Sequence, residues 1–302
     1  LPVEPFGVLV QEPVAVHLDA QGRRQTCSDG ISAVPCACGS LPKCTDEQRF
    51  NCCEDAGAFD HVYVAHLAGG EVSFFTSDTA GVRLVDFRGG FFDTTSSIRG
   101  GFALAASLPG DTSMPVYVSS RTASSIASFV IQEDRRVIAA PRAPIQAASP
   151  GTDVRGIAFA PGGEVLYAVS RSPASLVALD MSREDGVPRA EPLWMTEICG
   201  DPGVVRLAQN PQKPHDPMAQ LAYVVCFAEP VIYVVDTQLA QVVDRIYTGN
   251  GANGLVLDAR NRRAFTANFV ENTVGVIDLD PSRATYHQMV LRLGLRRNLV
   301  KD

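Results

Sequence analysis

Short apolar runs separated by turn residues recur along the chain in phase. Five stretches share one layout, in which an aromatic residue is followed nine positions later by an aliphatic one. The aromatic residues are Tyr63, Tyr117, Tyr167, Tyr223 and Phe265, and the aliphatic residues are Val72, Ile126, Leu176, Ile232 and Val274. A period of about 40–50 residues made of short β-rich runs is typical of propeller blades. The pattern predicts an all-β chain, a β-propeller of four-stranded antiparallel blades with five blades visible.

Each repeat offers four strand-sized apolar runs bounded by turn residues. The runs are continuous rather than alternating, as expected for sheets that are covered on both faces. In the second repeat the fourth run, RRVIAAP at 135–141, is expected to be the outer strand. No helical period of useful length occurs, so we interpret residues 1–302 as one propeller domain.

The innermost strands of such a ring converge near its axis. Gly7, Gly156 and Gly254 each open one of these strands, where a side chain is expected to crowd the neighbouring strand.

Ligands of propellers usually bind at the axial channel or on the loops of one face. Phe6, Arg155 and Asn253 stand just before the inner strands, with Arg99 and Arg206 nearby. Arg155 and Asn253 are therefore candidates to contact an anionic or polar ligand at the channel mouth. The alternative is that they cap strand ends and form hydrogen bonds across the channel.

Most of the cysteines lie in one stretch, residues 27–53, which interrupts the first repeat. This insertion is poor in apolar residues and rich in turn residues, so it needs covalent cross-links to hold a shape. Its six cysteines are Cys27, Cys36, Cys38, Cys44, Cys52 and Cys53. Their spacing fits the paired C-x₂₋₄-C pattern of zinc sites poorly. We expect a disulfide-rich loop, with free thiols as the alternative and the pairing left open.

Two further cysteines, Cys199 and Cys226, lie where the third repeat passes into the fourth. These elements are neighbours in a propeller, so a bond between the two is predicted; the alternative is two buried free thiols. A chain cross-linked in this way belongs in an oxidising compartment: the periplasm, the cell surface or the extracellular space.

The repeats resemble one known family on specific residues. Tyr63-Val64, Tyr117-Val118 and Tyr223-Val224 match the opening of the YVTN-type β-propeller repeat, and NTVGVIDLD at 272–280 matches its close. The resemblance implies an exported bacterial or archaeal propeller and says little about activity. Members of this family usually close with seven blades. The chain opens at Leu1 rather than Met, which favours blades before Leu1 over a ring closed with five.

The charge and motif content narrows the function classes. A formal net charge of −7 argues against binding to nucleic acid, and no apolar run is long enough to span a membrane. Metal-ligand and nucleophile motifs are absent from the sequence, so no metal site, catalytic residue or cofactor is predicted. Aspartates that end equivalent strands, Asp180, Asp236 and Asp278, are expected to accept backbone N–H bonds in the following turns. The basic tail at 295–302 is expected to be a solvated end, or else to dock on an acidic neighbour.

These observations favour a non-enzymatic function. The chain is interpreted as an exported scaffold or protein-binding module at the cell surface or in an extracellular assembly, with a protein partner or self-assembly. The cross-linked insertion is the expected recognition surface, since long ordered loops are usually functional. The alternative is a propeller subunit of a periplasmic redox enzyme or a lactonase-like hydrolase.

Overall fold

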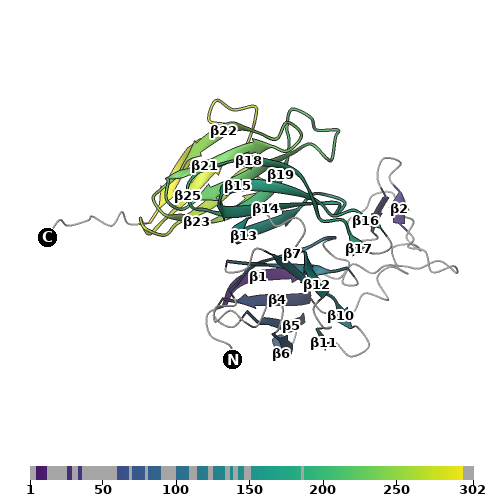
Figure 1. Ribbon diagram of the computed structural model, residues 1–302. Coiled ribbons are helices and arrows are strands. Elements are labelled where there is room, and N and C mark those ends of the chain that lie inside the picture. The colour runs from purple at the N-terminus through teal and green to yellow at the C-terminus, as the bar shows by residue number, and fades with distance from the viewer. Residues whose placement is uncertain are drawn as a thin grey trace.

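The computed structural model describes five four-stranded antiparallel sheets that follow one another around an axis (Figure 1). It describes residues 5–11, 26–28, 33–35, 60–67, 70–78, 81–89, 100–108, 114–121, 125–132, 137–138, 142–145, 151–184 and 187–294. Every regular element in these ranges is a strand. The predicted all-β propeller with four-stranded blades is confirmed, and the described residues form five blades.

Each blade uses consecutive stretches of the chain. Blade one contains β1 (Pro5–Gln11), β4 (Asp60–His66), β5 (Val72–Asp78) and β6 (Gly81–Arg88). Blade two contains β7 (Gly101–Ala106), β8 (Val116–Ser120), β9 (Ile126–Phe129) and β12 (Arg142–Ile145). Blade three contains β13 (Thr152–Phe159), β14 (Val165–Ser172), β15 (Ala174–Asp180) and β18 (Glu191–Glu197). Blade four contains β19 (Pro202–Gln209), β20 (Gln220–Cys226), β21 (Val231–Asp236) and β22 (Gln241–Tyr247). Blade five contains β23 (Ala252–Asp258), β24 (Arg263–Asn268), β25 (Thr273–Asp278) and β26 (Met289–Leu293).

Three small hairpins accompany the blades. They are β2 (Thr26–Ser28) with β3 (Ala33–Pro35), β10 (Ile131–Gln132) with β11 (Val137–Ile138), and β16 (Arg183–Glu184) with β17 (Val187–Pro188). The first hairpin lies in and next to the cysteine-rich insertion. Cys27 stands in β2, but its side chain and residues 36–59 lie outside the described part of the chain, as does the tail at 295–302.

The outer strand of blade two was predicted at 135–141, and this prediction is wrong. The outer strand is β12, while the apolar pair at 137–138 forms β11. Ile138 is fully buried in the core between blades one and two. Its backbone N–H donates to Asp86 Oδ2 at 2.8 Å and its carbonyl accepts from Arg88 Nη1 at 3.1 Å. The apolar run therefore covers a blade interface instead of extending a sheet.

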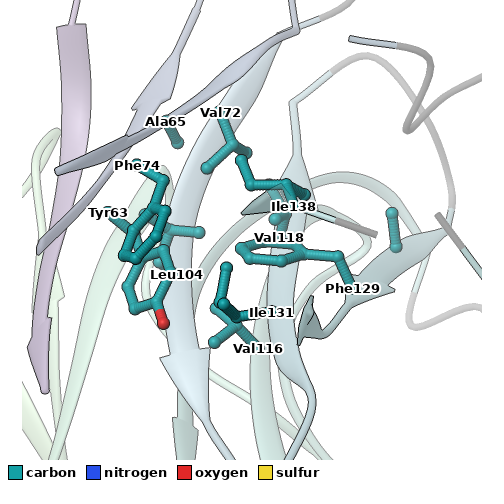
Figure 2. Close-up of a cluster of buried hydrophobic side chains, with 11 residues drawn as sticks. Tyr63, Ala65, Val72, Phe74, Leu104, Val116, Val118, Phe129, Ile131 and Ile138 are labelled. Atoms are coloured by element: carbon teal, nitrogen blue, oxygen red, sulfur yellow. The ribbon is translucent and has the colours of Figure 1, made fainter. Parts of the chain in front are cut away.

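The hydrophobic core lies between successive blades, and Figure 2 shows the cluster between blades one and two. The ring of Tyr63, which is fully buried, stacks on Phe74 at 5.3 Å between centroids and meets Phe129 of blade two at 5.6 Å. Similar clusters join blades two and three, three and four, and four and five. Burial between sheets is thus the main stabilising term, and each blade depends on its neighbours.

The inner strands pack in chain order: β1 on β7, β7 on β13, β13 on β19 and β19 on β23. Gly7 and Gly156 behave as predicted. An added Cβ would lie 2.3 Å from Phe102 O in the first case and 2.7 Å from Val205 N in the second. At Gly254 the prediction is wrong, because an added Cβ would meet only Ala267 of its own blade, at 3.5 Å. Among the described residues, β23 makes no comparable packing with β1, and this join is called the seam below.

The predicted bond between Cys199 and Cys226 is confirmed. The two cysteines form a disulfide with a Cα–Cα distance of 6.0 Å, and both are buried beside Val231. It joins the segment that enters blade four to the end of β20, so it fixes the passage from blade three into blade four.

Candidate functional site: the axial cavity

A β-bulge interrupts each of the five inner strands near its start. The register shifts lie between Pro5 and Gly7, Gly101 and Leu104, Val154 and Ile157, Pro202 and Val204, and Ala252 and Gly254. A bulge leaves a residue without a ladder partner and re-aims its side chain. The three residues predicted for the channel mouth, Phe6, Arg155 and Asn253, all stand at these bulges. Phe102 and Gly203 hold the corresponding places in blades two and four.

The bulges surround a cavity of about 180 Å³ on the axis. All five inner strands line it. The lining residues are Gly7, Val8, Phe102, Ala103, Leu104, Gly156, Ile157, Gly203, Val204, Arg206, Asn253, Gly254 and Leu255. Glycines and aliphatic residues make up most of this wall, so backbone is close to the space and polar side chains are few.

Arg206 and Asn253 are the polar side chains of this lining. Both are exposed to solvent within the cavity. Arg206 Nη1 donates to the carbonyl of Val205 at 2.9 Å, and among the described residues no carboxylate lies within ion-pair distance of its guanidinium. The surrounding protein removes part of the hydration of this group and lowers its pKa from the usual value. A guanidinium remains charged under such conditions, so the cavity holds an unneutralised positive charge.

Arg155 occupies the predicted position but has other partners. Its Nη2 donates to Asp153 Oδ2 at 2.9 Å and its Nε to Asp153 Oδ1, so the pair is bidentate. The guanidinium also lies over the ring of Phe102, 4.7 Å from its centroid. Its carbonyl accepts a 2.6 Å bond from Ser119 Oγ. The geometry follows the structural alternative for Arg155; ligand binding by this residue stays a prediction.

Asn253 lines the cavity, whereas the side chain of Phe6 lies outside the described part of the structure. Arg206, which the sequence placed only near the channel, is the cation that the cavity contains. Its signal in the sequence was weak, because it lies four residues into β19 rather than just before an inner strand.

The repeated aspartates take the structural role expected of them. Asp180 Oδ1 accepts the backbone N–H of Ser182 at 2.9 Å, Asp236 Oδ1 that of Gln238 at 2.9 Å, and Asp278 Oδ1 that of Asp280 at 3.0 Å. A hydrogen bond from Thr285 is the main cause that lowers the pKa of Asp278. These carboxylates lie in separate turns and do not converge on one point.

A second hollow, of about 460 Å³, lies along the outer strands of blades four and five, lined by Tyr247, Thr248 and residues 287–292. Beside it His287 bridges Asp244 and Tyr223: Nδ1 lies 2.7 Å from Asp244 Oδ2, and Nε2 lies 3.0 Å from the Tyr223 hydroxyl. This order of groups resembles a catalytic relay. Tyr223 is only 3% exposed, however, and burial raises its pKa, so its hydroxyl is neither accessible nor ionised. The relay holds blade five to blade four.

In the described part of the chain, no three His, Cys, Asp or Glu side chains are grouped so as to hold a metal ion. The same residues include no helix of the length and apolarity that would cross a membrane.

Comparisons with known proteins connect the chain to others through its fold. No protein-family model matches the sequence, and no curated protein does. Among solved structures, a Bacteroides uniformis protein provisionally assigned as a 6-phosphogluconolactonase matches with a TM-score of 0.57 and 15% identity over 97% of this chain and 83% of its own. The periplasmic gluconolactonase of Pseudomonas aeruginosa matches with a TM-score of 0.55 and 14% identity over 78% of this chain and 68% of its own. A hydrazine synthase chain of Kuenenia stuttgartiensis matches with a TM-score of 0.49 and 16% identity. The match covers 68% of this chain and about half, 53%, of the hydrazine synthase chain. At these identities the comparisons show the propeller fold alone.

Proposed function

We propose that the protein is an exported, non-enzymatic β-propeller that binds another protein, and that its axial cavity receives a carboxylate group of that partner. One observation carries the proposal: the described lining offers a guanidinium and an amide but no carboxylate, imidazole, thiol or hydroxyl side chain. Such a wall can attract and orient an anion. It contains no group that could act as a general base or nucleophile at neutral pH.

The carboxylate class follows from the charge and the size of the cavity. A guanidinium presents donors in a planar fork that matches a carboxylate, and charge-assisted bonds of this kind are stronger than neutral ones. The partial desolvation of Arg206 strengthens the attraction, because a lower local dielectric screens less. A volume of about 180 Å³ holds the tip of one acidic side chain or a small organic acid.

Export is supported by two observations. The Cys199–Cys226 disulfide forms and persists in oxidising compartments. One of the proteins that share the fold is a periplasmic enzyme. We therefore propose that the protein works in the periplasm, at the cell surface or outside the cell.

Calorimetric titration with two probes tests the proposal. Glutarate supplies a free carboxylate, a short peptide with one internal glutamate supplies a carboxylate on a polypeptide, and glutaramide is the neutral control. We expect the peptide to bind tighter than glutarate and glutaramide not to bind. Arg206→Gln should weaken binding by about 10–100-fold, the value of a lost charge-assisted hydrogen bond.

Arg262→Gln is the matched control, since it removes the same charge from an exposed arginine that pairs with Asp280 in a turn of blade five. It should bind both probes like the wild type. Equal affinities for glutarate and the peptide would indicate that the ligand is a small organic acid rather than a protein. If neither probe binds at millimolar concentration, the cavity proposal is wrong.

The alternative function is enzymatic: a lactonase-like hydrolase, or the propeller subunit of a redox enzyme. Three of the matched structures carry lactonase descriptions, which is the observation in its favour. Hydrolysis of gluconolactone above the uncatalysed rate, lost in Arg206→Gln and kept in Arg262→Gln, would establish the hydrolase. A visible absorption band in the native complex would instead favour the redox subunit.

A further inference from the structure

Every described blade has two apolar faces. A given repeat position lies on the corresponding face in every blade. The repeat aromatic and the aliphatic residue nine positions later face the next blade in the chain. In blades one to four these residues are all buried, with exposed fractions of 4% or less. They are Tyr63, Val72, Tyr117, Ile126, Tyr167, Leu176, Tyr223 and Ile232.

In blade five the same two positions are uncovered. Phe265 is 37% exposed and Val274 is 40% exposed. Cross-strand pairing extends them into two apolar rows, Val256–Phe265–Val276–Leu291 and Gly254–Ala267–Val274–Leu293. Val256, Leu291 and Leu293 are 63%, 51% and 50% exposed. No charged residue stands in either row. We call this surface the leading face.

The opposite kind of face is uncovered on blade one. Two other repeat positions pack against the preceding blade in blades two to five: the residue just before the repeat aromatic and the residue twelve positions after it. In blades two and five these residues are each at most 2% exposed: Val116, Phe129, Ala264 and Ile277. In blade one, Val62 and Phe75 hold these positions and are only partly buried. Their neighbours on the sheet, Val8, Val10, Leu84 and Val82, are 62%, 55%, 46% and 65% exposed. We call this surface the trailing face.

We propose that copies of this chain associate head to tail, the leading face of one copy packing against the trailing face of the next. The four internal blade interfaces are each made of one leading and one trailing face, and in the described part of the chain one face of each kind is exposed at the seam. The proposed contact is the next member of that series. At Gly254 the inner strand also has room for an approaching backbone, the approach that Gly7 and Gly156 already allow inside the chain.

A contact between two different faces has a consequence for assembly. In a dimer of this kind each copy still has one unoccupied face, so further copies can add. Association stops only if the rotation between successive copies closes a ring. This inference goes beyond the proposed function and does not depend on it. Val8 and Gly254 border both the faces and the axial cavity, so the test variants are made at Val10 and Val256, which do not line it.

Sedimentation velocity across micromolar concentrations tests the proposal on the whole chain. Wild type should form species larger than the 32.3 kDa monomer in a concentration-dependent way. Val256→Lys on the leading face and Val10→Lys on the trailing face should each sediment as a monomer. Mixed together, they should form a dimer and nothing larger, since each variant supplies the face that the other has lost. Val187→Lys is the matched control, an equally exposed valine (66%) in β17 away from both faces, and should assemble like wild type.

Each other outcome overturns the proposal. A wild type that stays monomeric means that another segment or partner covers the faces. Single variants that still assemble show that the contact lies elsewhere. A mixture that stays monomeric shows that the leading and trailing faces do not bind each other, and single variants that each form dimers show that like faces pair with like. Loss of assembly in Val187→Lys shows a non-specific effect of added charge.

Discussion

The two faces of blade five show what the apolar pattern of this chain means. One face packs on blade four through Leu255, Ala264 and Ile277, whose exposed fractions are 3%, 1% and 0%. The other face, with Phe265 and Val274, is just as apolar and is bare. Large exposed apolar patches on proteins mark interaction sites. The bare face therefore indicates a surface built to be covered, and its pattern is that of a blade interface.

The largest effect expected from this comparison concerns the repeat aromatic. Tyr117→Ala should lower the free energy of unfolding by about 3–5 kcal/mol, because the ring fills the core between blades two and three. Phe265→Ala should lower it by less than about 1 kcal/mol, because its ring already contacts solvent. Urea denaturation in the Val10→Lys background measures both without interference from assembly, because Val10 lies in blade one and Val256 is the cross-strand partner of Phe265. Equal losses would mean that the two positions are not comparable.

The disulfide sharpens the comparison between a joined and an unjoined pair of blades. Cys199→Ala removes the cross-link at the passage into blade four and should lower the free energy of unfolding by about 2–4 kcal/mol. Thermal unfolding with and without reducing agent checks this. Reductant should lower the unfolding temperature of wild type by breaking the Cys199–Cys226 bond. The variant lacks this bond, so reductant should not lower its unfolding temperature in the same way. A variant as stable as wild type would show that packing alone holds the join.

A smaller, pH-dependent effect is expected where blade five meets blade four. Burial lowers the pKa of His287 although Asp244 opposes the shift; Tyr223 and Tyr286 are the other titratable groups against the ring. A folded pKa below the unfolded value means that the unfolded state binds the proton more readily. The stabilisation that the neutral His287 gives to the folded state is therefore complete above about pH 6.5, the pKa of the unfolded state. It decreases as the pH falls through the folded pKa.

We expect the unfolding midpoint of wild type to fall between neutral pH and about pH 5. His287→Asn should be less sensitive over this range, since Asn tolerates the left-handed backbone at this position (φ 59°) and carries no titrating group. Urea midpoints at several pH values measure the difference. Parallel pH curves for the two proteins would contradict the assignment.

The smallest effect concerns a turn of blade five that neither face touches. Hydrogen bonds from the side chain and backbone of Ser282, with help from Arg262, lower the pKa of Asp280 to about 2. Because the pKa of Asp280 is lower in the folded state, its ionised carboxylate stabilises the fold above about pH 4. This stabilisation is lost as the pH falls towards 2. Asp280→Asn should be slightly less stable than wild type at pH 7, and the gap should close in acid. A gap that persists at the lowest pH would assign the effect to geometry rather than charge.

The sequence predicted the strands and their order because each apolar run is long, bounded by turn residues and repeated in phase. It also predicted the Cys199–Cys226 bond and the turn contacts of Asp180, Asp236 and Asp278, since these follow from local sequence and blade order. It missed the role of the run at 137–138, where tertiary burial of Ile138 overrides strand extension. The open space at Gly254 was also missed, because a repeat pattern does not show which inner strands pack closely among the described residues.

The candidate site was harder to predict than the fold. Arg155 and Arg206 are both arginines of inner strands, and the sequence pattern favoured Arg155 as the ligand contact. The pairing of Arg155 with Asp153 and Phe102 depends on a bulge and on side-chain directions, which have no signature in a single sequence. The YVTN resemblance and the role of the insertion at 27–53 stay predictions.

The five bulges also bear on how such a protein can change its ligand. Each blade has a register shift at this end of its inner strand, at positions 6, 102–103, 155–156, 203 and 253. Selection or design can vary these positions while the strand pairing beneath them stays the same. If the axial cavity binds the proposed carboxylate, its specificity depends on positions at the register shifts and can be changed one blade at a time.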